Sequence, residues 1–285
     1  MDKEKIMNTE TKTEEFVLPT EIKKVKKDAA PRDFVVVSQP KMGKSEIFGA
    51  FTRSYNALVL SLEKGGYEYI EGRILENYTS QSTSRWEAFL NYIKYRKVLL
   101  ENKGMYDYLL IDGLSDLDDL SEIGGTLAYM DTVMGKSFNR VNGIKDGPKL
   151  SYGDPNWKSV LTLADGAGYQ HTRKWFLDQI EIFRQISPYR IYAAHVADKY
   201  IRDNGKEEVI GNEIFLTGKL KTIFASKVTA LAKLIADGDQ RYLNFDVLND
   251  SIIAGSRAPL LQGKILISEK QENGEIKVFW NSIYK

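Results

Sequence analysis

The sequence predicts an α/β fold in which a mainly parallel sheet is flanked by helices and continues into an antiparallel C-terminal extension. From about residue 32, apolar runs typical of buried strands alternate with stretches of helical periodicity. This alternation is typical of parallel strands joined by right-handed crossover helices. After about Glu207 short alternating runs replace it, and the last two, 264–268 and 276–280, flank Asn273-Gly274. A hairpin is therefore expected at the end of the chain.

The first predicted strand and helix surround a short loop. Four consecutive apolar residues at 34–37 predict a buried strand, which breaks at Pro40. The triplet Gly43-Lys44-Ser45 then opens a run of helical spacing that predicts a helix over 44–54. The apolar residues that set this spacing are Ile47, Phe48, Ala50 and Phe51.

This order of strand, loop and helix is what a phosphate-binding loop requires. Gly43 lets the backbone curl close to phosphate oxygens, while successive N–H groups and the helix start supply partial positive charge. Lys44 can bridge the outer phosphates, and the Ser45 hydroxyl can ligate Mg²⁺. The usual pattern has glycine at the position of Ser38, and the triplet alone also occurs on ordinary turns. The expected nucleotide-binding residues of the loop are Ser38, Gln39, Pro40, Lys41, Met42, Gly43, Lys44 and Ser45.

Five further elements continue the alternation. Apolar runs predict strands at 56–62, 106–113 and 190–196. Helical spacing predicts helices at 84–103 and 175–186.

Two carboxylates stand where predicted strands end. The carboxyl ends of parallel strands meet at one crevice, so Asp112 can hold Mg²⁺ directly or through a water. Glu63 follows the strand at 56–62 and is a candidate base for a water that attacks the γ-phosphate. An acid is also a common strand end, and Glu63 could instead cap a helix or be solvated beside Lys64.

Further candidate groups lie later in the chain. His195, near the end of the strand at 190–196, could sense the γ-phosphate or hold the attacking water, or it could be a structural histidine. Phosphoryl transfer often needs one more cation than the loop supplies, given in cis or by a neighbour. The candidates for it are Lys219, Lys221 and Arg257, although single basic residues on turns are usually solvated.

Composition bounds the remaining possibilities. The 285 residues carry a net charge of +1, so no global electrostatic signature points to nucleic acid or a membrane. We expect no membrane span and no signal peptide, because no apolar run approaches the required length. Zero cysteines exclude disulfides and thiolate metal sites and fit a cytoplasmic protein. The mixed-charge residues 1–31 are expected to form a flexible or partner-docking arm before one domain at 32–285.

Two long segments, at about 122–170 and 197–214, are expected to be loops that could contact DNA. Basic side chains would meet phosphates and aromatic ones would stack on single-stranded bases. The alternative is ordinary surface loops, since the second segment is also rich in acids. The candidate residues are Arg140, Lys145, Lys149, Lys199, Arg202 and Lys206, with Trp157 and Tyr200 for stacking.

From Phe34 to the C-terminus these motifs resemble the RecA-like ATPases, and within them the RecA/RadA-related ATP-binding proteins of bacteriophages. The loop Pro40-Lys41-Met42-Gly43-Lys44-Ser45 looks like the phage version of the phosphate loop, and residues 168–173 resemble a further phage-family motif. The resemblance matches Glu63 to the catalytic glutamate, Asp112 to the Walker B acid and His195 to the γ-phosphate sensor.

The segment 219–226 resembles the one whose lysine reaches the neighbouring subunit's nucleotide, which implies Lys221 as that cation, with Lys219 second. The resemblance implies an ATPase that uses ATP and Mg²⁺, forms a head-to-tail homo-oligomer and acts in DNA recombination, single-strand annealing or replication. The alternative is a nucleotide-binding assembly or regulatory module of the same fold, with little turnover and no DNA binding. An arginine-rich lid, which a nucleotide kinase would need, is missing from the sequence.

Overall fold

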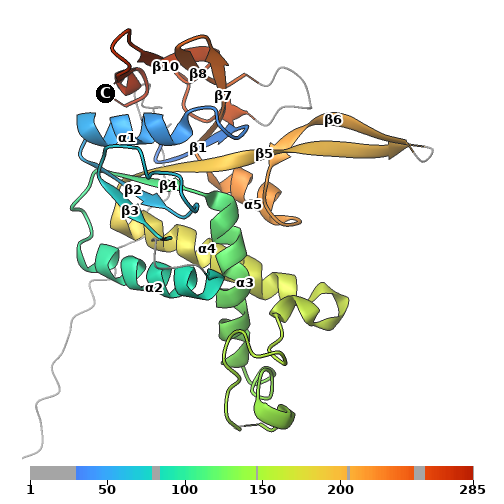
Figure 1. Cartoon of the computed structure of the whole chain (residues 1–285). Coiled ribbons are helices and arrows are strands. Elements are labelled where there is room, and N and C mark those ends of the chain that lie inside the picture. The colour runs from blue at the N-terminus through green and yellow to red at the C-terminus, as the bar shows by residue number, and fades with distance from the viewer. Residues whose placement is uncertain (1–29, 79–83, 146, 204–205, 247–253, 285) are drawn as a thin grey trace, which may run out of the picture.

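A mixed sheet of eleven strands forms the centre of the part of the chain that the structure describes (Figure 1). This computed structural model describes residues 30–284 except 79–83, 146, 204–205 and 247–253, and within 199–210 it describes the backbone alone. The expected arm at 1–31 therefore lies almost wholly outside the described residues.

The core of the sheet is parallel. Its six strands, in spatial order, are β7 (Ala230–Asp237), β1 (Asp33–Ser38), β5 (Tyr189–Asp203), β4 (Tyr108–Asp112), β2 (Ala57–Ser61) and β3 (Ile74–Glu76). Three antiparallel strands continue it beyond β7: β8 (Gln240–Asn244), β10 (Lys264–Lys270) and β11 (Ile276–Val278). Two more pair antiparallel off this path, β9 (Gly255–Ser256) with β7 and β6 (Lys206–Ile214) with β5. The predicted parallel core, the antiparallel extension and the terminal hairpin are confirmed.

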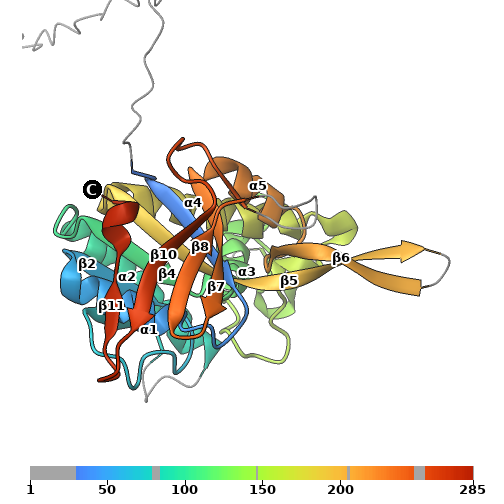
Figure 2. The same cartoon turned by 90° about the horizontal axis from the view of Figure 1, so that it is seen from above.

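Helices cover both faces of the parallel core. One face carries α1 (Lys44–Ser54), and the opposite face carries α2 (Arg85–Glu101), α4 (Gly168–Ile186) and α5 (Leu220–Lys227), with α3 (Leu114–Met130) packed against α4 (Figure 1). The short 3₁₀ segments are η1 (Val141–Gly143), η2 (Val160–Thr162), η3 (Ala164–Gly166) and η4 (Trp280–Ser282). The C-terminal strands, which lie in front in Figure 2, continue the sheet beyond β7, and their buried side chains share an apolar cluster with α1.

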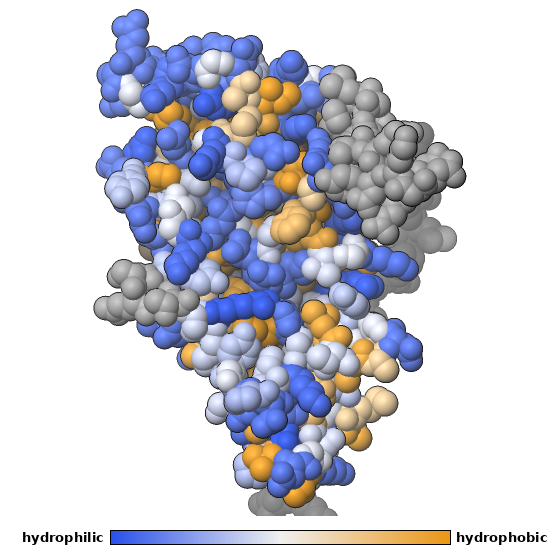
Figure 3. Space-filling view, turned by 45° about the vertical axis from the view of Figure 1, so that its right-hand side comes forward, coloured by the Kyte–Doolittle hydropathy of each residue, from blue (hydrophilic) through white to orange (hydrophobic). Residues whose placement is uncertain are grey.

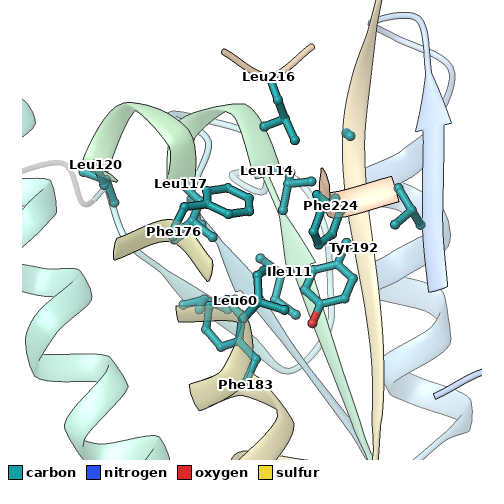
Figure 4. Close-up of a cluster of buried hydrophobic side chains, with 14 of the residues drawn as sticks. Leu60, Ile111, Leu114, Leu117, Leu120, Phe176, Phe183, Tyr192, Leu216 and Phe224 are labelled. Carbon is teal, nitrogen blue, oxygen red and sulfur yellow. The ribbon is translucent and has the colours of Figure 1, made fainter. Parts of the chain in front are cut away.

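Successive side chains of the core strands point to opposite faces of the sheet, and each face has its own apolar cluster. In β1, Val35 and Val37 face the side of α2 to α5, whereas Phe34 and Val36 face α1. The first cluster, shown in Figure 4, joins Leu60, Ile111 and Tyr192 of the sheet to the helices. Burial on both faces explains why these strands read as continuous apolar runs. The helical side chains that Figure 4 labels are Leu114, Leu117, Leu120, Phe176, Phe183 and Phe224.

One predicted loop is partly helix. The segment expected to be a loop from about residue 122 begins inside α3, which continues to Met130. Gly124 and Gly125 made this part of the sequence look irregular, but they let α4 approach closely. A Cβ on Gly124 would lie 2.1 Å from the Trp175 ring, and one on Gly125 would lie 2.8 Å from the Thr172 nitrogen. Both glycines are therefore required by helix packing rather than by a turn.

The second predicted loop is also wrong, because residues 197–214 form an antiparallel ribbon. The strand predicted at 190–196 continues to Asp203 and pairs with β6, so that the ribbon projects from the body of the molecule (Figure 2). The side chains expected to contact DNA at Lys199, Tyr200, Arg202 and Lys206 lie outside the described residues.

A buried ionic cluster ties the amino-terminal ends of β1 and β5 together. The Asp33 carboxylate lies 2.9 Å from the Arg190 guanidinium and 3.0 Å from Arg184, and it accepts a hydrogen bond from the Tyr192 hydroxyl. Both Asp33 and Arg190 are buried. Removing one partner of a buried pair leaves the other charge uncompensated.

We therefore expect Asp33→Ala to lower the free energy of unfolding by about 3–5 kcal/mol. Urea denaturation measures this loss, and Asp237→Ala, at the exposed end of β7, is the control that should change it by less than about 0.5 kcal/mol. Equal effects of the two substitutions would contradict a stabilising role for the cluster.

The visible surface in Figure 3 is mainly hydrophilic, with apolar side chains scattered in small patches. Among the described residues, no helix is long and apolar enough to span a bilayer.

Candidate functional site

The loop between β1 and α1 has the backbone geometry of an anion-binding turn. Gly43, the N-cap residue of α1, has φ +85°, a left-handed conformation that glycine adopts without strain. No side chain caps the helix, so the first-turn N–H groups are left for another acceptor. Such groups at a helix N-terminus bind phosphate readily.

Lys44 and Ser45 point from this loop toward Asp112 at the end of β4. Lys44 Nζ lies 3.5 Å from Asp112 Oδ1, and the Ser45 hydroxyl donates to Asp112 Oδ2 at 3.2 Å. Tyr67 also donates to Asp112 Oδ2, at 2.7 Å. Asp112 is fully buried, and its Oδ1 accepts no hydrogen bond from the described residues.

Glu63 lies beside these groups, just beyond the end of β2. Its Oε1 is 3.4 Å from Lys44 Nζ and 2.9 Å from His195 Nε2. β2, β4 and β5 are parallel neighbours, and the carboxyl ends of β2 and β4 lie level with the middle of β5, where its parallel pairing stops. Glu63, Asp112 and His195 therefore meet at the same edge of the parallel core. These contacts place Glu63, Asp112 and His195 beside Lys44 and Ser45 of the loop, and their role in nucleotide binding stays a prediction.

The surroundings give the two carboxylates opposite pKa shifts. Burial would raise the pKa of Glu63, but the hydrogen bond from His195 and the charge of Lys44 hold it below its ordinary value. Burial raises the pKa of Asp112 against the opposing charge of Lys44. Glu63 is therefore ionised at neutral pH and can accept a proton there.

Asp116, in the first turn of α3, was not singled out by the sequence. Burial and the nearby charge of Glu63 raise its pKa to about 7. The folded state thus holds a proton that the unfolded chain releases above pH ~4, so this group lowers stability as the pH rises from about 4 to about 7.

Asp116→Asn should therefore unfold with a free energy about 4 kcal/mol above that of the wild type at pH 8, and the difference should nearly vanish at pH 4. Urea denaturation at the two pH values measures it. A gap of the same size at both would contradict the raised pKa.

The C-terminal extension supplies the second wall of the pocket over the loop. This cavity, of about 500 Å³, is lined on one side by residues 41–47 and Glu63, and on the other by strands β8, β10 and β11 and the β7–β8 turn. The Arg241 guanidinium of β8 donates from Nε to the Met42 carbonyl at 3.2 Å. The residues of the second wall are Asp239, Arg241, Ser268, Lys270 and Ile276.

Several predicted residues lie outside this cavity. Ser38 is fully buried in β1, and Gln39 and Pro40 are exposed but do not line the pocket. Lys219 lines a separate cavity of about 970 Å³ beside α4 and α5. Lys221 pairs with Glu213 of the same chain, and Arg257 donates to the Ser226 carbonyl.

Sequence reasoning missed Tyr67 and Arg241. Tyr67 lies in a glycine-flanked loop after Glu63, where nothing in the pattern marks it, and Arg241 is almost 200 residues from the loop that it contacts. The observation that could have drawn attention to Arg241 is its place beside the turn of a hairpin that ends the parallel core.

The donor set fits Mg²⁺ held together with phosphate. A hydroxyl and a carboxylate lie side by side, and Asp112 Oδ1 has no hydrogen-bond donor. No group of three or more His, Cys, Asp or Glu side chains among the described residues could hold a metal. Mg²⁺ usually takes one or two protein ligands and completes its shell with phosphate oxygens and water.

The comparisons with known proteins agree with the geometry. No curated protein shows significant sequence similarity to the chain. The family model described as AAA domain matches residues 30–258, which include the loop, both carboxylates and Arg241. With most of its length matched, the chain belongs to this AAA domain family, of P-loop ATPase type.

Proposed function

We propose that this protein is a Mg²⁺-dependent, RecA-like ATPase that acts on DNA in recombination, single-strand annealing or replication, as do some of the bacteriophage proteins that its motifs resemble. The observation that carries the ATPase part is the position of Glu63, whose Oε1 lies within reach of both Lys44 and His195 beside the Ser45–Asp112 pair.

In the proposed hydrolysis, the loop binds the nucleotide and Glu63 activates the attacking water. The loop N–H groups and Lys44 bind the phosphates, and Glu63 orients a water molecule. As the water attacks the γ-phosphorus its proton passes to Glu63, and the bond to the bridging oxygen breaks to release ADP and phosphate. Ser45 and Asp112 would hold Mg²⁺, which supplies charge neutralisation at the phosphate oxygens.

Phosphate release from ATP by the purified protein, with Mg²⁺ and with EDTA, tests this proposal. We expect release that depends on Mg²⁺. The absence of any release above buffer, in protein shown by circular dichroism to be folded, would contradict it.

Arg241 is placed to act as the additional cation within the same chain. Arg241→Ala is expected to weaken binding of Mg·ATP about 3- to 10-fold, because one hydrogen-bonding charge at the loop is lost. Arg53→Ala, at the far end of α1, is the matched control. Equal affinities of the two variants, measured by calorimetry, would exclude this role.

Head-to-tail assembly is proposed to bring a neighbour's basic residue to the nucleotide. Lys221 is the candidate from the resemblance, and it would have to leave Glu213 to reach another subunit. Light scattering coupled to size exclusion, with and without a non-hydrolysable ATP analogue, tests assembly.

The DNA-binding part of the proposal concerns the basic and aromatic side chains of the segment 131–157. Arg140 donates to the Gly147 carbonyl, Lys149 pairs with Asp131, and Trp157 packs on Tyr152. These side chains therefore already have partners within residues 131–157. Lys145 is exposed. Retention of single-stranded DNA on filters should fall with salt if phosphates are contacted, and no retention with or without ATP would remove DNA from the proposal.

A second candidate is a nucleotide-binding assembly or regulatory module with little turnover. The pairing of Lys221 within its own chain favours it, because the expected trans cation is already neutralised. Stoichiometric ATP binding without hydrolysis would select this candidate.

A further inference from the structure

Two buried polar atoms on neighbouring strands have no hydrogen-bond partner among the described residues. They are Ser38 Oγ, in the last residue of β1, and His195 Nδ1, in β5. Ser38 is fully buried. Buried polar atoms are nearly always paired in folded proteins, so an unpaired pair of this kind needs an explanation.

The sheet register places these two atoms side by side. Ser38 and His195 are paired positions of the parallel strands β1 and β5. Paired residues of neighbouring strands lie about 4.8 Å apart and project to the same face. Two residues earlier, Val36 and Ala193 both enter the apolar cluster beneath α1, so Ser38 and His195 face α1 as well.

Glu63 lies at the same height of the sheet. Ser61 pairs with Asp112, and Asp112 pairs with Ala193. Two residues further along, Glu63 and His195 are therefore level, which is why His195 Nε2 reaches Glu63 Oε1 at 2.9 Å. His195 thus lies between the Ser38 hydroxyl on one side and the carboxylate on the other.

We propose that the Ser38 hydroxyl hydrogen-bonds His195 Nδ1 through one water molecule and is thereby a positioning residue for Glu63, an inference that rests on the proposed ATPase function. A neutral imidazole has one donor and one acceptor nitrogen. Occupying Nδ1 as the acceptor fixes the proton on Nε2, where it is donated to Glu63. The chemistry is compatible with one bridging water, which pairs two otherwise unsatisfied groups.

This contact gives a role to the departure from the usual loop pattern. Glycine at position 38 would have no hydroxyl to offer. When Lys44 turns to the phosphates, its contact with Glu63 Oε1 is released, and His195 is then the remaining contact that orients the base. Loss of the hydroxyl should therefore lower turnover and leave ATP binding unchanged.

Nitrogen NMR of the nucleotide-free protein tests the contact without any activity. The chain has two histidines, so His171→Gln assigns the His195 signals. We expect a protonated Nε2 and a hydrogen-bonded Nδ1 in the wild type, and a downfield shift of Nδ1 in Ser38→Ala, because the water that donates to this nitrogen loses the hydroxyl that holds it. Ser121→Ala removes another buried hydroxyl, one that donates to the Leu117 carbonyl inside α3, and should leave Nδ1 unchanged.

Kinetics test the consequence. Ser38→Ala should lower kcat about 3- to 10-fold with KM unchanged, and Ser38→Thr, which keeps the hydroxyl, should restore most of it. An Nδ1 signal that does not move in Ser38→Ala, or a kcat equal to that of Ser121→Ala, overturns the proposal. If the wild type hydrolyses no ATP, the proposed function fails, and with it the positioning role, while the NMR result still decides whether Ser38 contacts His195.

Discussion

Glu63→Gln is expected to lower kcat for ATP hydrolysis by about 10²- to 10⁴-fold, the range typical of a lost general base. Glutamine keeps the shape of the side chain and can still accept the hydrogen bond from His195, but it cannot take a proton from water. Binding should change little, because the loop, Lys44 and Ser45 are untouched. Single-turnover hydrolysis and calorimetry with ATP measure the two effects separately.

Glu76→Gln is the matched control, since Glu76 also ends a strand of the same parallel core, beside Ser61 of β2. It should retain wild-type turnover. A Glu63→Gln protein that hydrolyses ATP as fast as Glu76→Gln would show that another group accepts the proton, and Asp116 would then be the first to examine because burial and Glu63 raise its pKa to about 7.

Lys44→Ala is expected to lose about 10- to 100-fold in affinity for ATP, because charge-assisted hydrogen bonds to phosphate are lost. Lys44 is buried and is the cation that both Glu63 and Asp112 face, so its removal also raises the pKa of both carboxyls. In a thermal melt, saturating Mg·ATP should raise the melting temperature of the wild type by mass action and leave that of the variant almost unchanged.

Lys64→Ala is the control for this substitution. Lys64 follows Glu63 in the chain, but its side chain is exposed and does not line the cavity. A nucleotide-induced stabilisation of Lys44→Ala as large as that of Lys64→Ala would contradict the assignment of the loop.

The sequence predicted the parts of the fold that local patterns determine. The buried strands showed as continuous apolar runs, and the helix at 84–103 has its start at Ser84, which forms a capping box with Glu87. The acids Glu63 and Asp112 were found because each follows such a run. These patterns depend on a few neighbouring residues, so the sequence alone was sufficient to predict the elements that they form.

The remaining features depend on contacts between distant parts of the chain. Gly124 and Gly125 of α3 are needed because α4, some 50 residues later, packs closely against them. In the sequence alone, two adjacent glycines look the same as a turn. Arg241 reaches the phosphate loop only because β8 follows β7 at the edge of β1. The pairing of Lys221 with Glu213 likewise follows from the position of the β5–β6 ribbon beside α5.

Calorimetric titration of the wild-type protein with a Mg²⁺-complexed, non-hydrolysable ATP analogue tests the central claim most directly. Two temperatures are needed, because a binding enthalpy can pass through zero at one of them. We predict saturable binding of one triphosphate per chain, weakened in Lys44→Ala. Folded protein that gives no heat of binding at either temperature would contradict the assignment of this pocket as a nucleotide site.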